Sequence, residues 1–211
     1  MNRIAIILPY FGKLPDYFGL FLNSCKENPT IDWYLFTDDR RTYAFPSNVY
    51  VEYMSFSDLK SFFQEKFDFD ICLNTPYKLC DYKPAYGYIF SDLIKDYDFW
   101  GYCDLDLLWG NIRKFLPDGE IIKYDKVGHL GHLALYQNAQ EVNTIFMAEI
   151  EGRHRYKEVF SCEGSCVFDE WGEWSINRIL LHLKKKLWIW NDFFDVYAYD
   201  ENLTRVVFSF G

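Results

Sequence analysis

Apolar and polar residues alternate in blocks along the first forty residues, and these blocks predict a strand, a helix and a second strand. The run IAIIL at residues 4–8 is continuously apolar and stops at a proline, which is typical of a strand buried on both faces of a parallel sheet. Asp16 then opens a segment whose apolar residues recur at helical spacing up to Cys25. The next run, WYLFTDD at residues 33–39, again ends in polar residues. This order predicts a βαβ unit with parallel strands.

Similar patterns continue toward the C-terminus. NVYVEY at residues 48–53 predicts a strand, and SDLKSFFQEKF, beginning at Ser57, has the pattern of a capped amphipathic helix. YKLCDYKPAYGYIFSDLIKDY predicts two helical pieces, because the residue before Pro84 is biased away from helical geometry while proline suits a first helical turn. FWGYC and VGHLGHLALY predict two more strands, and EWSINRILLHLKKK at residues 173–186 predicts a helix.

The length of the chain limits the number of domains. A chain of 211 residues, half of them hydrophobic, can bury one substantial core but is short for two. We therefore expect a single α/β domain. In parallel sheets ligands bind at the carboxyl ends of the strands, which here are Pro9–Phe11 and Thr37–Asp39.

Charge and hydropathy narrow the class of protein. The formal net charge of −9 argues against a nucleic-acid partner, because such a protein needs a basic face to neutralise phosphates. No segment approaches the roughly 20 apolar residues that span a bilayer, and the apolar run at the N-terminus is too short for a signal peptide. We therefore expect a cytoplasmic protein whose six cysteines are reduced core thiols.

The stretch FWGYCDLDLLWG places Asp104 and Asp106 directly after an apolar run. At the end of a strand, residues two apart share one side of the chain, so a single cation can meet both carboxylates. Hard oxygen ligands of this kind suit Mg²⁺ or Mn²⁺, and a bound diphosphate can complete the coordination shell. The tripeptide alone is weak evidence, because Asp-x-Asp also occurs at residues 68–70 and 96–98, and a capped strand end explains it more simply.

Three segments together resemble the nucleotide-sugar-dependent glycosyltransferases of the GT-A type, in particular small bacterial enzymes of surface-polysaccharide biosynthesis. They are the first strand with LPYFGKLPDYFGLFLNSC, the strand end WYLFTDD, and KLCDYKPAYGYIF followed by the Asp-x-Asp strand. The resemblance implies a GT-A-like, Rossmann-like fold, with a mixed, mostly parallel sheet flanked by helices in one domain. It also implies a nucleotide-sugar-binding half at residues 1–110 and an acceptor-binding half at residues 111–211.

The resemblance also implies roles for individual residues. Asp106 is expected to ligate a Mn²⁺ or Mg²⁺ ion that bridges the two donor phosphates, and Asp104 to approach that ion or the ribose. The other donor-binding candidates are Pro9, Tyr10, Phe11, Asp38, Asp39, Lys78, Tyr82, Lys83 and His129. A solvated helix face explains the lysines equally well, and core packing explains the aromatic residues.

An inverting transfer needs a carboxylate that takes the proton from the acceptor hydroxyl. CVFDEWGEW supplies Asp169, our first choice, and Glu170; the structural alternative is an acidic residue that favours a helix dipole. His129 and His132 flank a glycine, so a strand or turn there puts one of them near the substrate cleft. His129 is the candidate that meets the donor sugar or the acceptor, although a single histidine on an apolar segment is more often structural. Related transferases take a further metal ligand near the C-terminus, for which RVVFSFG has no clear equivalent.

The implied partners are a UDP-sugar donor and a glycan or lipid-linked glycan acceptor. LHLKKKLWIWNDFF places Lys184, Lys185 and Lys186 beside Trp188 and Trp190, which suggests a peripheral contact with the anionic inner face of a membrane. A basic helix end followed by a core strand explains these residues as well.

Two other functions stay open on the sequence. Aspartate-nucleophile phosphatases also place Asp-x-Asp after an apolar strand, with Asp104 as nucleophile and Asp106 as acid/base. Their motif, however, follows the first strand and has Thr or Val where Leu108 stands. A noncatalytic sugar-binding module could use the 20 Phe, 17 Tyr and 7 Trp to stack pyranose rings, but it leaves the strand-end carboxylates without a purpose.

Overall fold

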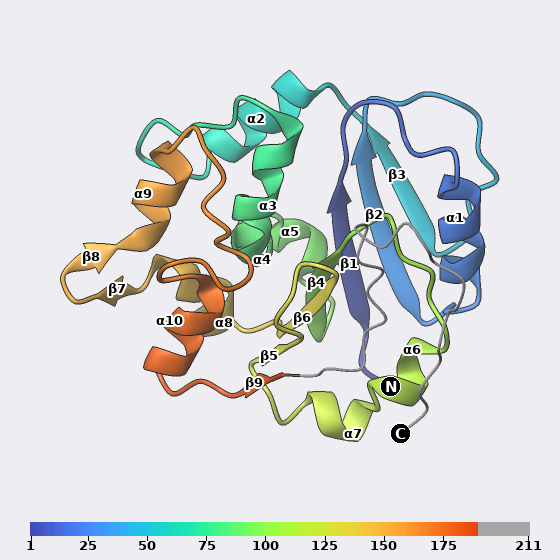
Figure 1. The fold of residues 1–211 in the computed structure, drawn as a ribbon. Coiled ribbons are helices and arrows are strands. Elements are labelled where there is room, and N and C mark those ends of the chain that lie inside the picture. Colours follow the sequence, from blue (N-terminus) through green and yellow to red (C-terminus); the bar gives the residue numbers. More distant parts are fainter. Residues whose placement is uncertain (190–211) are drawn as a thin grey trace, which may run out of the picture.

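The computed structural model describes residues 1–189, and this part of the chain folds around a seven-stranded sheet with helices on both faces (Figure 1). The strand order is β3-β2-β1-β4-β6-β5-β9, and a separate hairpin pairs β7 with β8. The strands are β1 (Ile4–Pro9), β2 (Ile31–Thr37), β3 (Val49–Tyr53), β4 (Phe99–Cys103), β5 (Lys126–Val127), β6 (Leu133–Gln137), β7 (Glu149–Ile150), β8 (Arg153–His154) and β9 (Leu187–Trp188).

The sheet is mixed and mostly parallel. β1 pairs in parallel with β2 and with β4, and β2 pairs in parallel with β3. β6 runs antiparallel to both β4 and β5, and β9 then pairs in parallel with β5. The prediction of a single α/β domain with a mixed, mostly parallel sheet flanked by helices is confirmed, as is the opening βαβ unit.

The helices between these strands are mostly short. The α-helices are α1 (Phe18–Lys26), α2 (Phe56–Gln64), α3 (Leu79–Tyr82), α4 (Tyr86–Ile89), α5 (Ser91–Ile94), α6 (Ile112–Phe115), α7 (Asp118–Ile121), α8 (Gln140–Asn143), α9 (Arg155–Ser161) and α10 (Ile176–His182). Single 3₁₀ turns lie at Pro76–Lys78, Lys83–Ala85 and Ile145–Met147. None of the helices within residues 1–189 is long and apolar enough to cross a membrane.

Two helix starts and the state of one cysteine differ from the sequence prediction. α2 is capped by Ser55 rather than Ser57, because the Ser55 hydroxyl accepts a hydrogen bond from the Asp58 amide and the Asp58 carboxylate accepts one from the Ser55 amide. α10 begins only at Ile176, because the residues before it form a turn that carries Asp169. Cys162 is exposed rather than part of the core.

Alternate side chains of the central strands enter two separate cores. Ile4, Ile6 and Leu8 of β1 pack on the face covered by α1, α6 and α7. Ala5 and Ile7 point to the opposite face, which carries α2 to α5 and α8 to α10. Each fully buried isoleucine contributes roughly 1.5–3 kcal/mol through removal from water, so this two-sided burial accounts for the continuous apolar run of β1.

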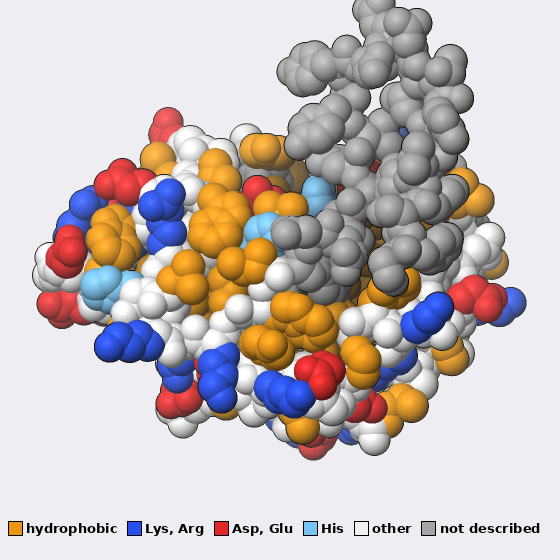
Figure 2. All heavy atoms as spheres, turned by 60° about the horizontal axis from the view of Figure 1, so that its bottom comes forward, with side chains coloured by type: hydrophobic (Ala, Val, Ile, Leu, Met, Phe, Trp, Pro, Cys, Tyr) orange, Lys and Arg blue, Asp and Glu red, His pale blue; other side chains and the backbone are white. Residues whose placement is uncertain are grey.

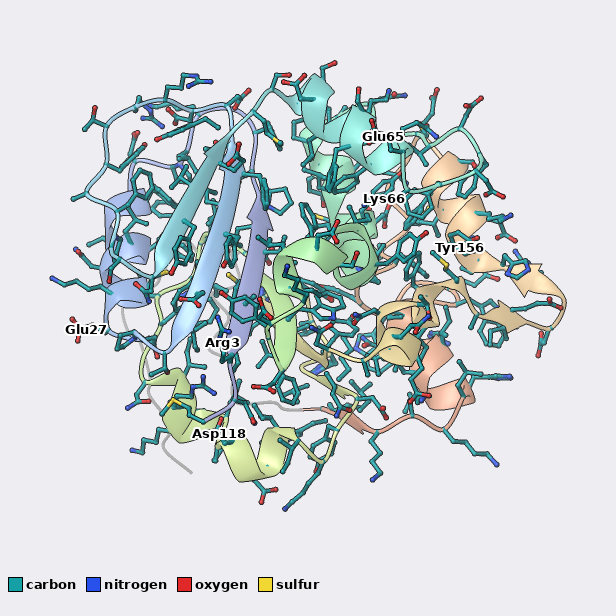
Figure 3. All side chains as sticks on the ribbon, turned by 180° about the vertical axis from the view of Figure 1, so that it is seen from behind. Arg3, Glu27, Glu65, Lys66, Asp118 and Tyr156 are labelled. Carbon is teal, nitrogen blue, oxygen red and sulfur yellow. The ribbon has the colours of Figure 1, made fainter. Side chains whose placement is uncertain are left out.

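The two ends of β1 have different surroundings. Figure 3 shows Arg3 and Asp118 at the amino end, where the Asp118 carboxylate accepts the Asn2 amide at 3.1 Å and pairs with Arg113 at 2.9 Å. These contacts fasten α7 to the beginning of the chain. The carboxyl end of β1 opens instead onto a pocket.

Candidate functional site

A pocket of about 410 Å³ lies at the carboxyl ends of β1 and β4. Strands β2 and β3 extend the sheet on one side of β1, whereas β4 lies on the other side, so the chain order reverses between β1 and β4. Open α/β sheets bind their ligands in the crevice at such a switch point. The topology thus singles out this pocket as the candidate site.

Three segments supply the walls of the pocket: the end of β1 with its following loop, the helical segment before β4, and the end of β4. The sequence candidates among its lining residues are Pro9, Tyr10, Phe11, Lys83, Asp104 and Asp106. Tyr17, Cys80 and Tyr86 line it as well and were not predicted. The structure therefore brings together residues from the three segments that carry the sequence resemblance.

Two other candidates face the core instead. The Lys78 ammonium lies 2.8 Å from the Asp81 carboxylate and donates to the Gly164 carbonyl at 2.6 Å. Tyr82 is fully buried and stacks on Phe160 with ring centroids 4.1 Å apart. Neither side chain lines the pocket, because local spacing does not reveal which face of the short helical pieces turns inward.

Asp38 and Asp39 shape the loop after β1. The Gly12 amide donates to Asp38 Oδ1 at 2.7 Å, and the Leu14 amide donates to Asp39 Oδ2 at 2.9 Å. Hydrogen bonds from the Arg41 guanidinium hold the pKa of Asp39 well below its ordinary value. Both aspartates line a second, shallow pocket beside the first, where Asp38 is the more exposed of the two.

Lys83 is the centre of a charge cluster at the floor of the main pocket. Its Nζ lies 2.8 Å from Asp104 Oδ1 and 3.4 Å from Asp169 Oδ2. Nζ also donates to the Gly131 carbonyl at 3.3 Å. Burial lowers the pKa of Lys83, but the two carboxylates outweigh it and hold the pKa above its ordinary value. Lys83 is therefore a permanent buried cation.

Asp104 stands between this cation and a histidine. His132 Nδ1 lies 3.5 Å from Asp104 Oδ2, and the Asp104 amide donates to the His132 carbonyl at 3.2 Å. Burial raises the pKa of Asp104, but the His132 imidazole and the Lys83 ammonium outweigh it, so the pKa lies below its ordinary value. Asp104 is ionised and held in one orientation at the edge of the pocket.

Asp169 is the second carboxylate of the cluster and has the opposite electrostatic character. Asp169 does not itself line the pocket but contacts Lys83, which does. Asp169 is only 5% exposed, and this burial, together with the neighbouring Glu170, raises its pKa to about 6 in spite of Lys83. Glu170 Oε1 accepts the Gly131 amide at 2.7 Å, so Glu170 joins the two turns. A Cβ atom at Gly131 would lie 2.9 Å from Glu170 Oε1 and 3.0 Å from Lys83 Nζ, so a larger residue here would displace one of these charged groups.

The buried Asp81 fastens the segment that leads to Asp169. Its carboxylate accepts the amides of Cys166, at 2.9 Å, and Phe168, at 3.0 Å. Between them Val167 has a φ of 52°, a conformation that is strained for a β-branched residue. Such strain persists only where the surroundings impose it, and here the pair of Asp81 with Lys78 does so.

The Asp-x-Asp pair offers a cation two protein ligands. Asp106 is exposed at the pocket wall and forms no ion pair with another residue in 1–189. Across that range, no three His, Cys, Asp or Glu side chains group as a complete metal site. Mg²⁺ typically uses one or two carboxylates together with substrate phosphates and water. Asp106 and Asp104 fit that mode, with Asp106 the less encumbered ligand because Lys83 already neutralises Asp104.

The histidine that approaches the Asp-x-Asp pair is His132, not His129. His129 is buried, its ring packs against Trp171 with centroids 5.9 Å apart, and it does not line the pocket. The sequence GHLGHL made both histidines candidates but could not predict which of them reaches Asp104, because that depends on the turn between β5 and β6. The sequence also did not predict the contact of Lys83 with Asp169, because no local sequence pattern links residues so far apart in the chain.

The three lysines of the proposed basic patch, residues 184–186, have different surroundings in the structure. Lys185 is engaged by Glu141 at 2.8 Å and by Asp125 at 4.0 Å, whereas Lys184 and Lys186 are exposed. Figure 2 shows Lys and Arg side chains scattered among acidic and neutral ones on the face it brings forward. Trp190 and the segment RVVFSFG lie outside the described residues.

Comparisons with known proteins give one family and distant structural neighbours. Residues 6–210 match a family described as "Family of unknown function (DUF6625)". No curated protein matches the sequence. A structure of the galactosyltransferase LgtC with donor and acceptor sugar analogs is similar at 12% identity and a TM-score of 0.46, covering 89% of this chain and 73% of that chain. An active-site mutant of LgtC is similar at 11% identity, with the same coverage and TM-score.

Proposed function

The chain belongs to DUF6625, a family of unknown function, and we propose that it is a metal-dependent glycosyltransferase. In this proposal it moves a sugar from a nucleoside diphosphate, with UDP as the expected nucleotide, to a glycan or lipid-linked glycan of a surface polysaccharide. The observation that carries the proposal is the pocket at the switch point between β1 and β4, with Asp104 and Asp106 at its wall. A sugar donor needs such a crevice together with carboxylates that hold its diphosphate through a cation.

The donor side uses the aromatic wall and the Asp-x-Asp pair. Tyr10 and Tyr17 line the pocket beside the end of β1 and offer flat apolar surfaces to a nucleoside. Asp106, with Asp104, holds Mn²⁺ or Mg²⁺; when bound, the cation acts as a Lewis acid that offsets the negative charge of the departing diphosphate. Lys83 keeps Asp104 ionised and fixes its orientation.

The acceptor side uses Asp169 as general base. A base must be ionised at working pH yet retain affinity for a proton, and a pKa of about 6 meets both needs near neutrality. Glu170 is less suited to this role because one of its carboxylate oxygens is engaged by the Gly131 amide. The assigned roles are thus Asp106 and Asp104 for the donor, and Asp169 for the acceptor hydroxyl.

A thermal-shift panel tests the donor site. UDP, GDP, CDP and ADP are added with and without Mn²⁺ to wild type, to Asp106→Asn, and to Asp70→Asn as a matched control from another Asp-x-Asp. A ligand at about 100 times its Kd stabilises the native state by roughly 2.7 kcal/mol, which for a chain of this size raises Tm by about 5–10 °C.

The expected result is a Mn²⁺-dependent shift with one nucleotide that is lost in Asp106→Asn and kept in Asp70→Asn. Failure of every nucleotide to shift wild type would contradict the proposal, and an equal shift in Asp106→Asn would remove that residue from the metal site.

A further inference from the structure

Lys126 is a fully buried lysine beneath the candidate base. It lies on β5, and its Nζ donates to Asn177 Oδ1 at 2.6 Å; both residues are 0% exposed. Among residues 1–189 Lys126 forms no ion pair, and its ammonium lies 5.4 Å from the centroid of the Tyr136 ring. Burial lowers the pKa of Lys126 to about 7, although Asp169 and Glu170 act to raise it. A buried lysine without a carboxylate partner is costly, which raises the question of what it does.

Asn177 connects Lys126 to two turns of the site. The Asn177 side-chain amide donates to the His129 carbonyl at 2.6 Å and to the Glu170 carbonyl at 2.8 Å. Both amide hydrogens are used in this way, while the amide oxygen accepts from Lys126. One buried side chain therefore clasps the turn at residues 128–132 to the turn at residues 169–170.

Lys126 satisfies the buried oxygen of the Asn177 amide. The His129 and Glu170 carbonyls can only accept, so they require the nitrogen of the amide and exclude its oxygen. The oxygen is left facing Lys126, whose Nζ donates to it. Without that donor the buried amide oxygen would lose its hydrogen bond, and the clasp between the two turns would be weakened.

These two turns carry the groups that surround Lys83. The first turn contributes the Gly131 carbonyl to Lys83 and His132 to its partner Asp104, and the second contributes Asp169 to Lys83. We propose that Lys126 and Asn177 are positioning residues that hold Asp169 at its place beside Lys83 for proton transfer, without touching the donor pocket. This inference rests on the proposed function, because it assumes that Asp169 is the base. Neither Lys126 nor Asn177 lines the pocket.

The test uses Asn177→Asp and Lys126→Met. Asn177→Asp keeps the size of the side chain but points an oxygen at the two carbonyls, and Lys126→Met keeps the length of the stem but removes the donor. Asn48→Asp is the matched control, because Asn48 is a buried asparagine whose amide donates to the carbonyls of Cys25 and Ile31, each at 3.0 Å, near the amino end of the sheet.

Kinetics are measured with the nucleotide sugar whose nucleotide shifts the wild type. Both site variants are expected to keep the donor KM within about twofold while kcat falls by about tenfold to a hundredfold, as expected for a misplaced catalytic group. Asn48→Asp is expected to lose stability with kcat unchanged. A kcat equal to wild type in both site variants overturns the inference.

Hydrogen exchange separates this inference from the proposed function. The Gly131 amide, which donates to Glu170 across the two turns, is expected to exchange at least about tenfold faster in both site variants and at the wild-type rate in Asn48→Asp. Unchanged Gly131 protection refutes the clasp even if the enzyme transfers sugar. Faster Gly131 exchange in both site variants, together with a wild type that transfers no sugar, retains the clasp and rejects the transferase.

Discussion

Removing the Lys83 ammonium is expected to cost a large part of the stability of the fold, and to do so in a pH-dependent way. Lys83→Met keeps the apolar stem but leaves Asp104 and Asp169 without the cation that lies 2.8 Å from one and 3.4 Å from the other. Removing one partner of a buried charge pair typically costs about 3–5 kcal/mol, because the remaining charge stays desolvated. We expect a loss of about that size at pH 7.5.

The pH dependence follows from the pKa of each carboxyl. Asp169 has a pKa raised to about 6 in the folded state, so the folded state holds a proton there that the unfolded state releases between about pH 4 and 6. Stability from this group is present below that window and is lost as pH rises through it. Lys83→Met removes the cation that lowers the pKa of both carboxyls, so the pKa of each rises, and protonation at pH 5 relieves part of the loss. Each unit of added pKa shift corresponds to about 1.4 kcal/mol.

The assay is urea denaturation of wild type and Lys83→Met at pH 7.5 and pH 5. Lys123→Met is the matched control, because Lys123 pairs with Glu120 at 2.6 Å on the exposed surface, where such a pair contributes about 0–1 kcal/mol. We expect the loss in Lys83→Met to exceed that of the control at pH 7.5 and to shrink by at least about 1.4 kcal/mol at pH 5. Equal losses in the two variants, or a larger loss at pH 5, would refute the reasoning about the buried cluster.

Two further predictions concern the base and the packing of the sheet. Because Asp169 must be ionised to accept a proton, the rate of sugar transfer is expected to fall about tenfold for each pH unit below 6. Asp169→Asn is expected to lower the rate by roughly 10²–10⁴-fold and to abolish this acidic dependence. A pH–rate profile of wild type and variant checks both results. A Cβ at Gly87 would lie against the Trp100 indole, so Gly87→Ala is expected to destabilise by about 1–3 kcal/mol. At Gly19 in α1 a Cβ meets nothing within 4 Å, so Gly19→Ala is expected to stabilise by about 0.5–1 kcal/mol in the same urea assay.

The strands β1 to β4 and the place of the Asp-x-Asp pair could be predicted from the sequence, whereas VGHLGHLALY, predicted as one strand, contains the end of β5, a turn and most of β6. The apolar run at residues 4–8 predicts a strand buried on both faces, and β1 is such a strand. The aromatic run before Asp104 likewise predicts β4, and with it a carboxylate at a strand end facing the pocket. These features depend on residues close together in the chain, whose apolar spacing is set by the geometry of the element that they form.

The partners of each charged group were decided only by the tertiary structure. Lys78 and Lys83 have the same side chain on neighbouring turns, yet one pairs with Asp81 in the core and the other with Asp104 and Asp169. His132 rather than His129 reaches Asp104 for the same kind of reason. The sequence by itself thus determined the central strands and the two carboxylates at the end of β4. Which charges meet depended on how distant segments pack, because the Coulomb energy of a pair depends on the distance in space and on burial, not on separation along the chain.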